Sequence, residues 1–260
     1  AILNYDNEYF DFLANIALNY GASKIIKVGK KQGADIRLVE HTYEPSINKT
    51  TVKVEVNDQA VSYQLSLIGD HFVMNSLLVV AACNSLGIDL TKVFKQIELI
   101  QPVGGRGQVH TISIAPNQTI TLIDDAYNAQ PSSMKAGLTA LGQIPTGLSG
   151  RRIAVLGEMR ELGVDSPGLH KELLPFLEKA NVEVLFACCG DMKLLFDCLP
   201  ASQQGGFSER AEDLWKTLLE SLQNGDVVFI KGSKSTKVSL LVHRLLSLHQ
   251  DILSSQLEVA

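Results

Sequence analysis

In the first part of the chain, the spacing of hydrophobic residues is that of a strand in some segments and that of a helix in others. Three short apolar runs predict buried strands, at residues 2–4, 24–29 and 34–39. Five apolar residues between the first two runs share one face of a helix: Phe10, Leu13, Ile16, Ala17 and Tyr20. A strand, a helix and a second strand in this order predict a right-handed crossover, and hence parallel strands.

The pattern then changes to strict alternation of apolar and polar residues, the period of a half-exposed strand. Residues 51–56 and 62–67 flank a turn at 57–59, which predicts an antiparallel hairpin with one wet face. From Val73 onward an apolar run predicts a largely buried helix with Asn75 in its first turn. Backbone donors are free in a first turn, so the Asn75 amide faces either a ligand or its own backbone.

Residues 101–107 interrupt these patterns with three glycines and one proline, a composition typical of a hinge or domain boundary. Arg106 lies inside this loop. A planar guanidinium in a glycine-rich loop suits phosphoryl oxygens, and a solvated hinge arginine is the alternative. We therefore expect two domains, residues 1–106 and 107–260.

Beyond the hinge, strands and helices follow one another repeatedly. The predicted strands lie at 109–114, 119–123, 152–157, 182–187 and 226–230. The predicted helices lie around Leu169 to Leu177, at 192–198, at 211–222 and around Val238 to Leu245. This alternation predicts a doubly wound sheet of Rossmann type. No G-x-G-x-x-G follows a strand, so the sequence does not support dinucleotide binding.

Two adjacent acids, Asp124 and Asp125, end the apolar run at 119–123, and Pro131 then opens a helical pattern. Open α/β sheets bind ligands where strands end in charged residues just before helices. Like charges repel, so a structure keeps both acids only where cations, hydrogen-bond donors or solvent stabilise their negative charge. The alternative is an acidic solvated turn with a helix cap.

A second polar turn follows the last predicted strand. Lys231, Gly232 and Ser233 place a cation, a flexible backbone and a hydroxyl at an expected helix N-terminus. Such a turn suits a carboxylate or a phosphate, and a solvated basic turn is the alternative.

Composition narrows the class of protein. The chain is 45% hydrophobic and 20% charged, as in ordinary globular proteins, and its net charge of −5 argues against a nucleic-acid surface. No apolar run has the length that a membrane helix needs. The four cysteines lack C-x-x-C spacing, which argues against a zinc site and favours reduced cytosolic thiols. A buried strand at residues 2–4 predicts an upstream neighbour in the parent protein.

These motifs, taken in order, resemble those of the bacterial Mur ligases. Residues 122–133, 155–163 with His170, and 230–233 resemble the C-terminal domain of that family. Residues 1–6, 69–71 with Asn75, and 105–106 resemble the second half of its central ATPase domain. The run Asp-Asp-Ala-Tyr-Asn-Ala at 124–129 is most similar to the member that adds D-alanyl-D-alanine to a UDP-muramoyl-tripeptide.

The resemblance implies an ATP-dependent peptide ligase of peptidoglycan synthesis that works through an acyl phosphate. It implies a partial central ATPase domain with parallel strands and an antiparallel hairpin, followed by a Rossmann-like C-terminal domain. By resemblance, Asn75 holds the adenine end, Arg106 the transferred phosphate, and Asp125 the ribose or the hinge. Four further residues are implied near the incoming dipeptide or the closed cleft: Tyr127, Asn128, Lys231 and Ser233. Arg106 and Lys231 are the implied catalytic residues.

Three positions depart from the family pattern. The family usually has Asn where Phe72 and Gln130 stand, and Gly107 after the arginine is unusual. Phe72 removes one polar contact near the nucleotide.

The sequence also contains no G-x-x-x-x-G-K-[ST] loop. We therefore expect this loop and the ligands of Mg²⁺ upstream of Ala1, and the chain alone to be inactive. The implied partners are a UDP-muramoyl-peptide and D-alanyl-D-alanine, with no nucleic acid or membrane, and the implied state is a cytoplasmic monomer. The alternatives are a non-catalytic α/β nucleotide- or peptide-binding module, and a sister Mur or folylpolyglutamate-type ligase.

Overall fold

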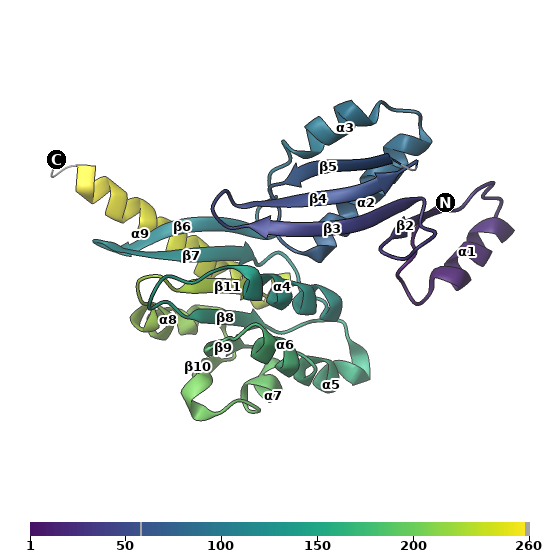
Figure 1. Ribbon diagram of the computed structural model, residues 1–260. Coiled ribbons are helices and arrows are strands. Elements are labelled where there is room, and N and C mark those ends of the chain that lie inside the picture. The colour runs from purple at the N-terminus through teal and green to yellow at the C-terminus, as the bar shows by residue number, and fades with distance from the viewer. Residues whose placement is uncertain (58, 258–260) are drawn as a thin grey trace. The chain divides into compact units, whose positions relative to one another are not determined.

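The computed structural model describes residues 1–57 and 59–257, so that Asp58 of the predicted hairpin turn lies outside the described residues. The chain divides into two compact units, Ala1–Gln101 and Pro102–Ala260 (Figure 1). The boundary between the units lies before residue 106 because the end of the loop at residues 101–107 is hydrogen-bonded to the rest of the second unit. The Tyr127 amide donates to the Gly105 carbonyl, and the Gly107 amide to the Asp124 carbonyl.

The first unit is a five-stranded sheet with helices packed on it. Its elements are β1 (Ile2–Asn4), α1 (Phe10–Asn19), β2 (Ile26–Gly29), β3 (Ile36–Glu44), β4 (Lys49–Val56), β5 (Gln59–Leu65), α2 (Asp70–Ser85) and α3 (Leu90–Ile97). The strands lie in the order β1-β2-β3-β4-β5, with β1, β2 and β3 parallel and the last two pairs antiparallel. The predicted parallel strands and antiparallel hairpin are confirmed.

The core of this unit forms where α2 lies across the sheet. Val73, Leu77 and Val80 recur at helical spacing, and all three are fully buried against strand residues such as Val52 and Val54. α2 begins at Asp70, earlier than predicted, so Asn75 lies in the second turn and is exposed. The expectation that Asn75 lies in a first turn with free backbone donors is therefore wrong, as is the alternative of a buried asparagine.

The second unit contains a six-stranded sheet. Its strands are β6 (Gln108–Ala115), β7 (Gln118–Asp125), β8 (Arg152–Gly157), β9 (Val184–Cys188), β10 (Gln204–Ser208) and β11 (Val227–Lys231). Its α-helices are α4 (Pro131–Gln143), α5 (Ser166–Lys171), α6 (Leu174–Lys179), α7 (Met192–Phe196), α8 (Trp215–Ser221) and α9 (Ser239–Leu257). The order is β10-β9-β8-β11-β7-β6, parallel throughout except for the edge strand β6. The predicted Rossmann-like sheet is confirmed.

Burial on both faces explains the continuous apolar strands of this sheet. Phe229 of β11 faces α4. A side chain at Gly137 of α4 would collide with the Phe229 ring, so the ring fits only because residue 137 is glycine. Val228 and Ile230 point the other way, into a cluster with Leu241 of α9. Figure 1 shows α4 in front of this sheet and α9 behind it.

Two features of the second unit differ from the sequence prediction. No strand was predicted for β10, because its two glycines weaken the strand pattern; a side chain at Gly205 would collide with Val184 and Phe186 of β9. The single helix predicted around Leu169 to Leu177 is instead two, α5 and α6. Pro175 has no amide to continue the first helix, so it starts the second.

The exposed linker between the units should be the first site of proteolysis. Leu99, Ile100 and Val103 are exposed, whereas residues 105–107 are bonded to the second unit. We expect thermolysin to cut between residues 99 and 104 and to leave a stable product that contains residues 109–248, seen by mass spectrometry. First cuts within residues 153–177 would contradict the two-unit division.

Candidate active site

The carboxyl ends of the parallel strands in the second unit meet along one edge of the sheet. β7 ends at Asp125, β8 at Gly157, β9 at Cys188 and β11 at Lys231. Asp125 and Lys231 lie opposite each other in register on adjacent strands. Ligand sites in open α/β sheets lie at this edge.

Lys231 is a buried cation that joins β11 to the turn after β7. Its Nζ lies 2.7 Å from Asp125 Oδ2 and 3.0 Å from the Asn128 carbonyl oxygen. Only 4% of the Lys231 side chain and 15% of the Asp125 side chain are exposed. The alternative of a solvated basic turn is therefore wrong for Lys231.

Burial is the main influence on the pKa of Asp125. It raises the pKa of the Asp125 carboxyl above the ordinary value of 3.8, and the neighbouring Asp124 adds to the rise. Lys231 and Arg106 act against it, because their positive charges favour the carboxylate. Asp125 therefore depends on these two cations for its charge.

The adjacent acids avoid each other by binding different partners. Asp124 Oδ2 accepts from the Gly105 amide at 3.0 Å, and Oδ1 from the Ala126 amide at 3.2 Å. Gly105 adopts φ +73°, and a side chain there would crowd Tyr127. Asp124 thus binds the loop that carries Arg106, while Asp125 binds Lys231. The alternative of an acidic solvated turn is wrong, although the helix that Pro131 opens is confirmed as α4.

Arg106 lies over an aromatic ring beside this pair. Its guanidinium carbon is 4.1 Å from the centre of the Tyr127 ring, and both residues are exposed. Stacking on tyrosine holds the guanidinium plane while the side chain stays accessible. The structure thus brings Arg106, Asp125, Tyr127, Asn128 and Lys231 together, as the sequence analysis expects of one site.

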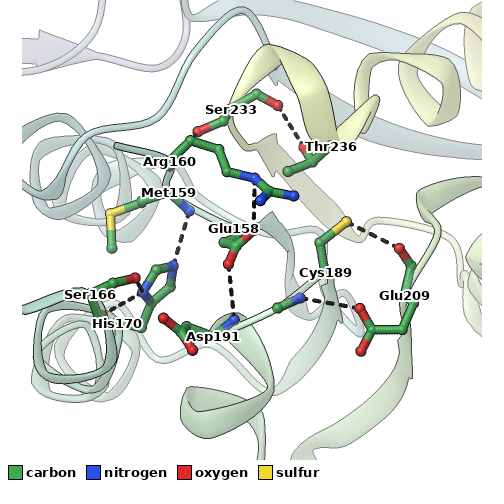
Figure 2. Close-up of polar contacts among 11 residues, drawn as sticks. Glu158, Met159, Arg160, Ser166, His170, Cys189, Asp191, Glu209, Ser233 and Thr236 are labelled. Atoms are coloured by element: carbon green, nitrogen blue, oxygen red, sulfur yellow. Dashed lines mark hydrogen bonds and ion pairs between the residues drawn. The ribbon is translucent and has the colours of Figure 1, made fainter. Parts of the chain in front are cut away.

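Ser233 lies close by but does not begin a helix. Its hydroxyl accepts from the Arg160 amide at 2.9 Å, and its amide donates to the Glu158 carbonyl at 3.2 Å. A short 3-10 turn follows, and α9 starts only at Ser239. The expectation that an α-helix begins at residues 231–233 is therefore wrong, because only a three-residue 3-10 turn follows Ser233. Ser233 instead joins the end of β11 to the turn after β8 (Figure 2).

Two open hollows flank this junction. The first, of about 390 Å³ and here called the Asn128 hollow, is lined by Asn128, Gln130, Arg160, Glu161, Ser233, Lys234 and Ser235. The second, of about 480 Å³ and here called the Cys189 hollow, is lined by residues that include Glu158, Arg160, Cys189, Glu209, Arg210 and Lys237. Arg160 borders both hollows. Their walls carry charges of both signs, which suits a small polar ligand.

Glu158, Arg160 and His170 also lie at this edge but were not predicted as site residues from the sequence. The available signal was the same as for Asp125, because Glu158 directly follows a buried strand at the carboxyl edge. Asn75 belongs to the first unit, whereas the residues of this cluster belong to the second.

Within residues 1–57 and 59–257, no three His, Cys, Asp or Glu side chains form a metal-binding group, so these residues do not fit a Mg²⁺ site of their own. No helix in the described part of the chain is long and apolar enough to cross a membrane.

Comparison with protein families matches residues 105–234 to the Mur ligase glutamate ligase domain and residues 1–83 to the Mur ligase middle domain. A ligase of Rickettsia prowazekii named UDP-N-acetylmuramoyl-tripeptide–D-alanyl-D-alanine ligase is 28% identical over 93% of this chain and 52% of its own. The Haemophilus influenzae protein of the same name is 27% identical over 94% and 50%. The chain thus spans about half the length of these curated relatives.

The fold is also found among solved structures. The MurF ligase from Thermotoga maritima, in complex with ADP, superimposes with a TM-score of 0.75 over 98% of this chain and 54% of its own, at 22% identity. At this identity the likeness shows the fold, which agrees with the α/β architecture of both units.

Removing the cation from the Lys231–Asp125 pair should destabilise the second unit. Lys231→Met leaves the Asp125 charge buried without a partner, which costs about 3–5 kcal/mol near neutral pH. The cost should grow as the pH rises above the raised pKa that Asp125 has beside Lys231, and should level off above the still higher pKa that it has in the variant, because the wild type loses the carboxyl proton first. Urea unfolding at several pH values measures this.

The double variant Lys231→Met/Asp125→Asn is the matched control, since it removes both charges. We expect it to recover most of the lost stability and to show no such pH dependence. Equal stability of the single variant and wild type at all pH values would show that the pair does not contribute.

Proposed function

The chain belongs to the Mur ligase family, and on this premise we propose that it supplies half of an ATP-dependent ligase that joins D-alanyl-D-alanine to a UDP-N-acetylmuramoyl-tripeptide in peptidoglycan synthesis. Curated relatives with that name match more than nine-tenths of the chain. The observation that carries the proposal is the junction of Lys231, Asp125 and Asn128 beside Arg106, because a charged, preorganised edge suits the chemistry of acyl phosphates.

The proposed reaction has two steps. The terminal carboxylate of the tripeptide attacks the γ-phosphorus of ATP, which releases ADP and gives an acyl phosphate. The neutral amine of the dipeptide then attacks the acyl carbon to form a tetrahedral intermediate, which loses a proton from nitrogen to solvent and expels phosphate with the bonding electrons to leave the amide. Both steps concentrate negative charge on oxygen, so positioning and charge neutralisation supply most of the rate.

Arg106 is proposed to bind the phosphoryl group during this transfer. Its fork of donors matches two phosphoryl oxygens, and its stacking on Tyr127 limits its freedom before substrate binds. In a closed enzyme this arrangement places a fixed cation where charge develops. Asp125 remains the proposed contact to the ribose or the hinge, and Asn75 the proposed contact to adenine.

Lys231 is proposed to act chiefly by position. Two of the three ammonium donors are engaged by Asp125 and the Asn128 carbonyl, and the side chain is buried. It therefore fixes the turn that presents Tyr127 and the Asn128 amide. A direct contact between Lys231 and substrate stays a prediction.

The Asn128 hollow is proposed to receive the dipeptide. A zwitterionic dipeptide carries an ammonium and a carboxylate, and this hollow offers Glu161 to the first and Arg160 and Lys234 to the second. Asn128 and Ser233, both predicted as substrate-binding residues, line the same hollow.

We place the complete ligase in the cytoplasm, where ATP and UDP-linked precursors are available, and propose that it works as a monomer. The proposed Mg²⁺ neutralises the phosphates of ATP, and by resemblance to the family we expect its ligands in the upstream half of the ligase.

The 260 residues alone should release no phosphate from ATP above background. The sequence holds no G-x-x-x-x-G-K-[ST] loop of backbone donors, on which phosphoryl transfer in this class depends. Joining the upstream half in the same chain should restore release that depends on both the tripeptide precursor and the dipeptide. Clear Mg²⁺-dependent ATP turnover by the isolated chain would contradict the proposal, and failure of the joined chain would favour a binding module.

In an active ligase that contains these residues, Arg106→Ala should lower turnover far more than it weakens ATP binding. A charge-assisted contact made to the transition state contributes about 2.7–4 kcal/mol in comparable oxyanion sites, or a factor of about 10² to 10³ in rate. Steady-state kinetics and calorimetry with ATP measure the two effects. Arg106→Lys keeps the charge and removes the fork, so it should be intermediate; unchanged turnover in Arg106→Ala would make Arg106 a solvated hinge residue.

A further inference from the structure

Three consecutive amides in the turn after β8 each have a different long-range partner. The Glu158 amide donates to the Cys188 carbonyl at 3.1 Å, and the Arg160 amide to the Ser233 hydroxyl at 2.9 Å. The Met159 amide between them donates to Nε2 of His170 at 3.0 Å (Figure 2). Strand β9, the turn after β11 and helix α5 thus each hold one residue of this turn.

The partners of His170 determine its protonation state. A backbone amide can only donate, so Nε2 must be an unprotonated acceptor toward Met159. Nδ1 lies 2.7 Å from the Ser166 carbonyl oxygen, which can only accept, so Nδ1 carries the hydrogen. His170 is therefore the neutral Nδ1–H tautomer, and its ring is fully buried.

The turn that His170 binds carries two charged side chains into the hollows. Glu158 Oε1 accepts from the Asp191 amide at 3.1 Å, and Oε2 lies 2.8 Å from Nε of Arg160. A side chain at Gly190 would lie 2.0 Å from Glu158 Oε1, so the carboxylate fits only because that residue is glycine. Arg160 then extends between the Asn128 hollow and the Cys189 hollow. A shift of the Met159 amide moves both of its charged neighbours.

We propose that His170 is a positioning residue: as the neutral Nδ1–H tautomer it fixes the turn at residues 158–160 and so aims Glu158 and Arg160 into the two hollows. Its functional part rests on the proposed function, because Arg160 there faces the carboxylate of the incoming dipeptide. The imidazole suits this place because one rigid ring accepts on one side and donates on the other. An apolar side chain of similar volume fills the space and does neither.

The test compares His170→Leu, which keeps the volume, with His170→Gln, which restores an amide oxygen as acceptor. His243→Gln on the exposed face of α9 is the matched control for a histidine replacement. In ¹⁵N spectra of the wild-type chain, Nε2 of His170 should show the shift of an unprotonated nitrogen and a coupling across the hydrogen bond to Met159.

Hydrogen exchange at the Met159 amide should be about tenfold faster in His170→Leu, the factor that corresponds to one lost hydrogen bond, and should return toward wild type in His170→Gln. Amides within β8 should keep their protection. A titration with D-alanyl-D-alanine, followed at the amides of Asn128, Arg160 and Ser233, should give a Kd about tenfold higher in His170→Leu than in His170→Gln or the control.

Unchanged Met159 exchange in His170→Leu, or a protonated Nε2 in the wild type, would overturn the inference. Equal weakening in both His170 variants together with an equal loss of Tm would assign His170 to packing alone, which also overturns it. A wild-type chain that does not respond to the dipeptide contradicts the proposed function, and the exchange comparison then decides the inference about His170 by itself.

Discussion

The buried ion pair between Lys231 and Asp125 is the constraint around which the second unit is arranged. Two charges at the ends of adjacent parallel strands are stable only if each finds the other and the remaining donors are satisfied. The second contact of Lys231, with the Asn128 carbonyl, engages a further donor of the ammonium and fixes the turn that leads into α4. The same pair determines where Tyr127 lies, and Arg106 stacks on the ring of Tyr127.

The ends of β11 and β8 lie close together, and the turns that follow them form the other part of this edge of the sheet. A side chain at Gly232 would lie 2.8 Å from the Cα of Gly157, so the end of β11 can approach β8 this closely only because residue 232 is glycine. The turns that follow them then exchange hydrogen bonds through Ser233 and Arg160. The result is a rim of polar groups held by hydrogen bonds that involve the main chain. Preorganisation of this kind suits a reaction whose barrier is mainly electrostatic.

A ligase that forms and consumes an acyl phosphate needs cations that neutralise oxygen charge and a site that orients an amine. The second unit carries groups suited to both tasks, with Arg106 next to the Lys231–Asp125 pair and a hollow of mixed charge beside it. The first unit contributes an α/β sheet and the exposed Asn75. The phosphate loop that would complete the proposed chemistry does not occur in the sequence. We therefore propose that this chain and an upstream half each supply part of the active site.

Local pattern in the sequence was sufficient to predict most strands, the polar ends of β7 and β11, and the family, because these depend on residues close together in the chain. It could not reveal that Lys231 is buried on Asp125, since 106 residues separate them, or that Asp124 and Asp125 bind different partners. Nor could it show that His170 accepts from Met159, which lies in a turn outside its own helix. A lysine, an acid or a histidine is compatible with both solvent and core, and only the partner that tertiary packing brings within hydrogen-bond distance decides between them.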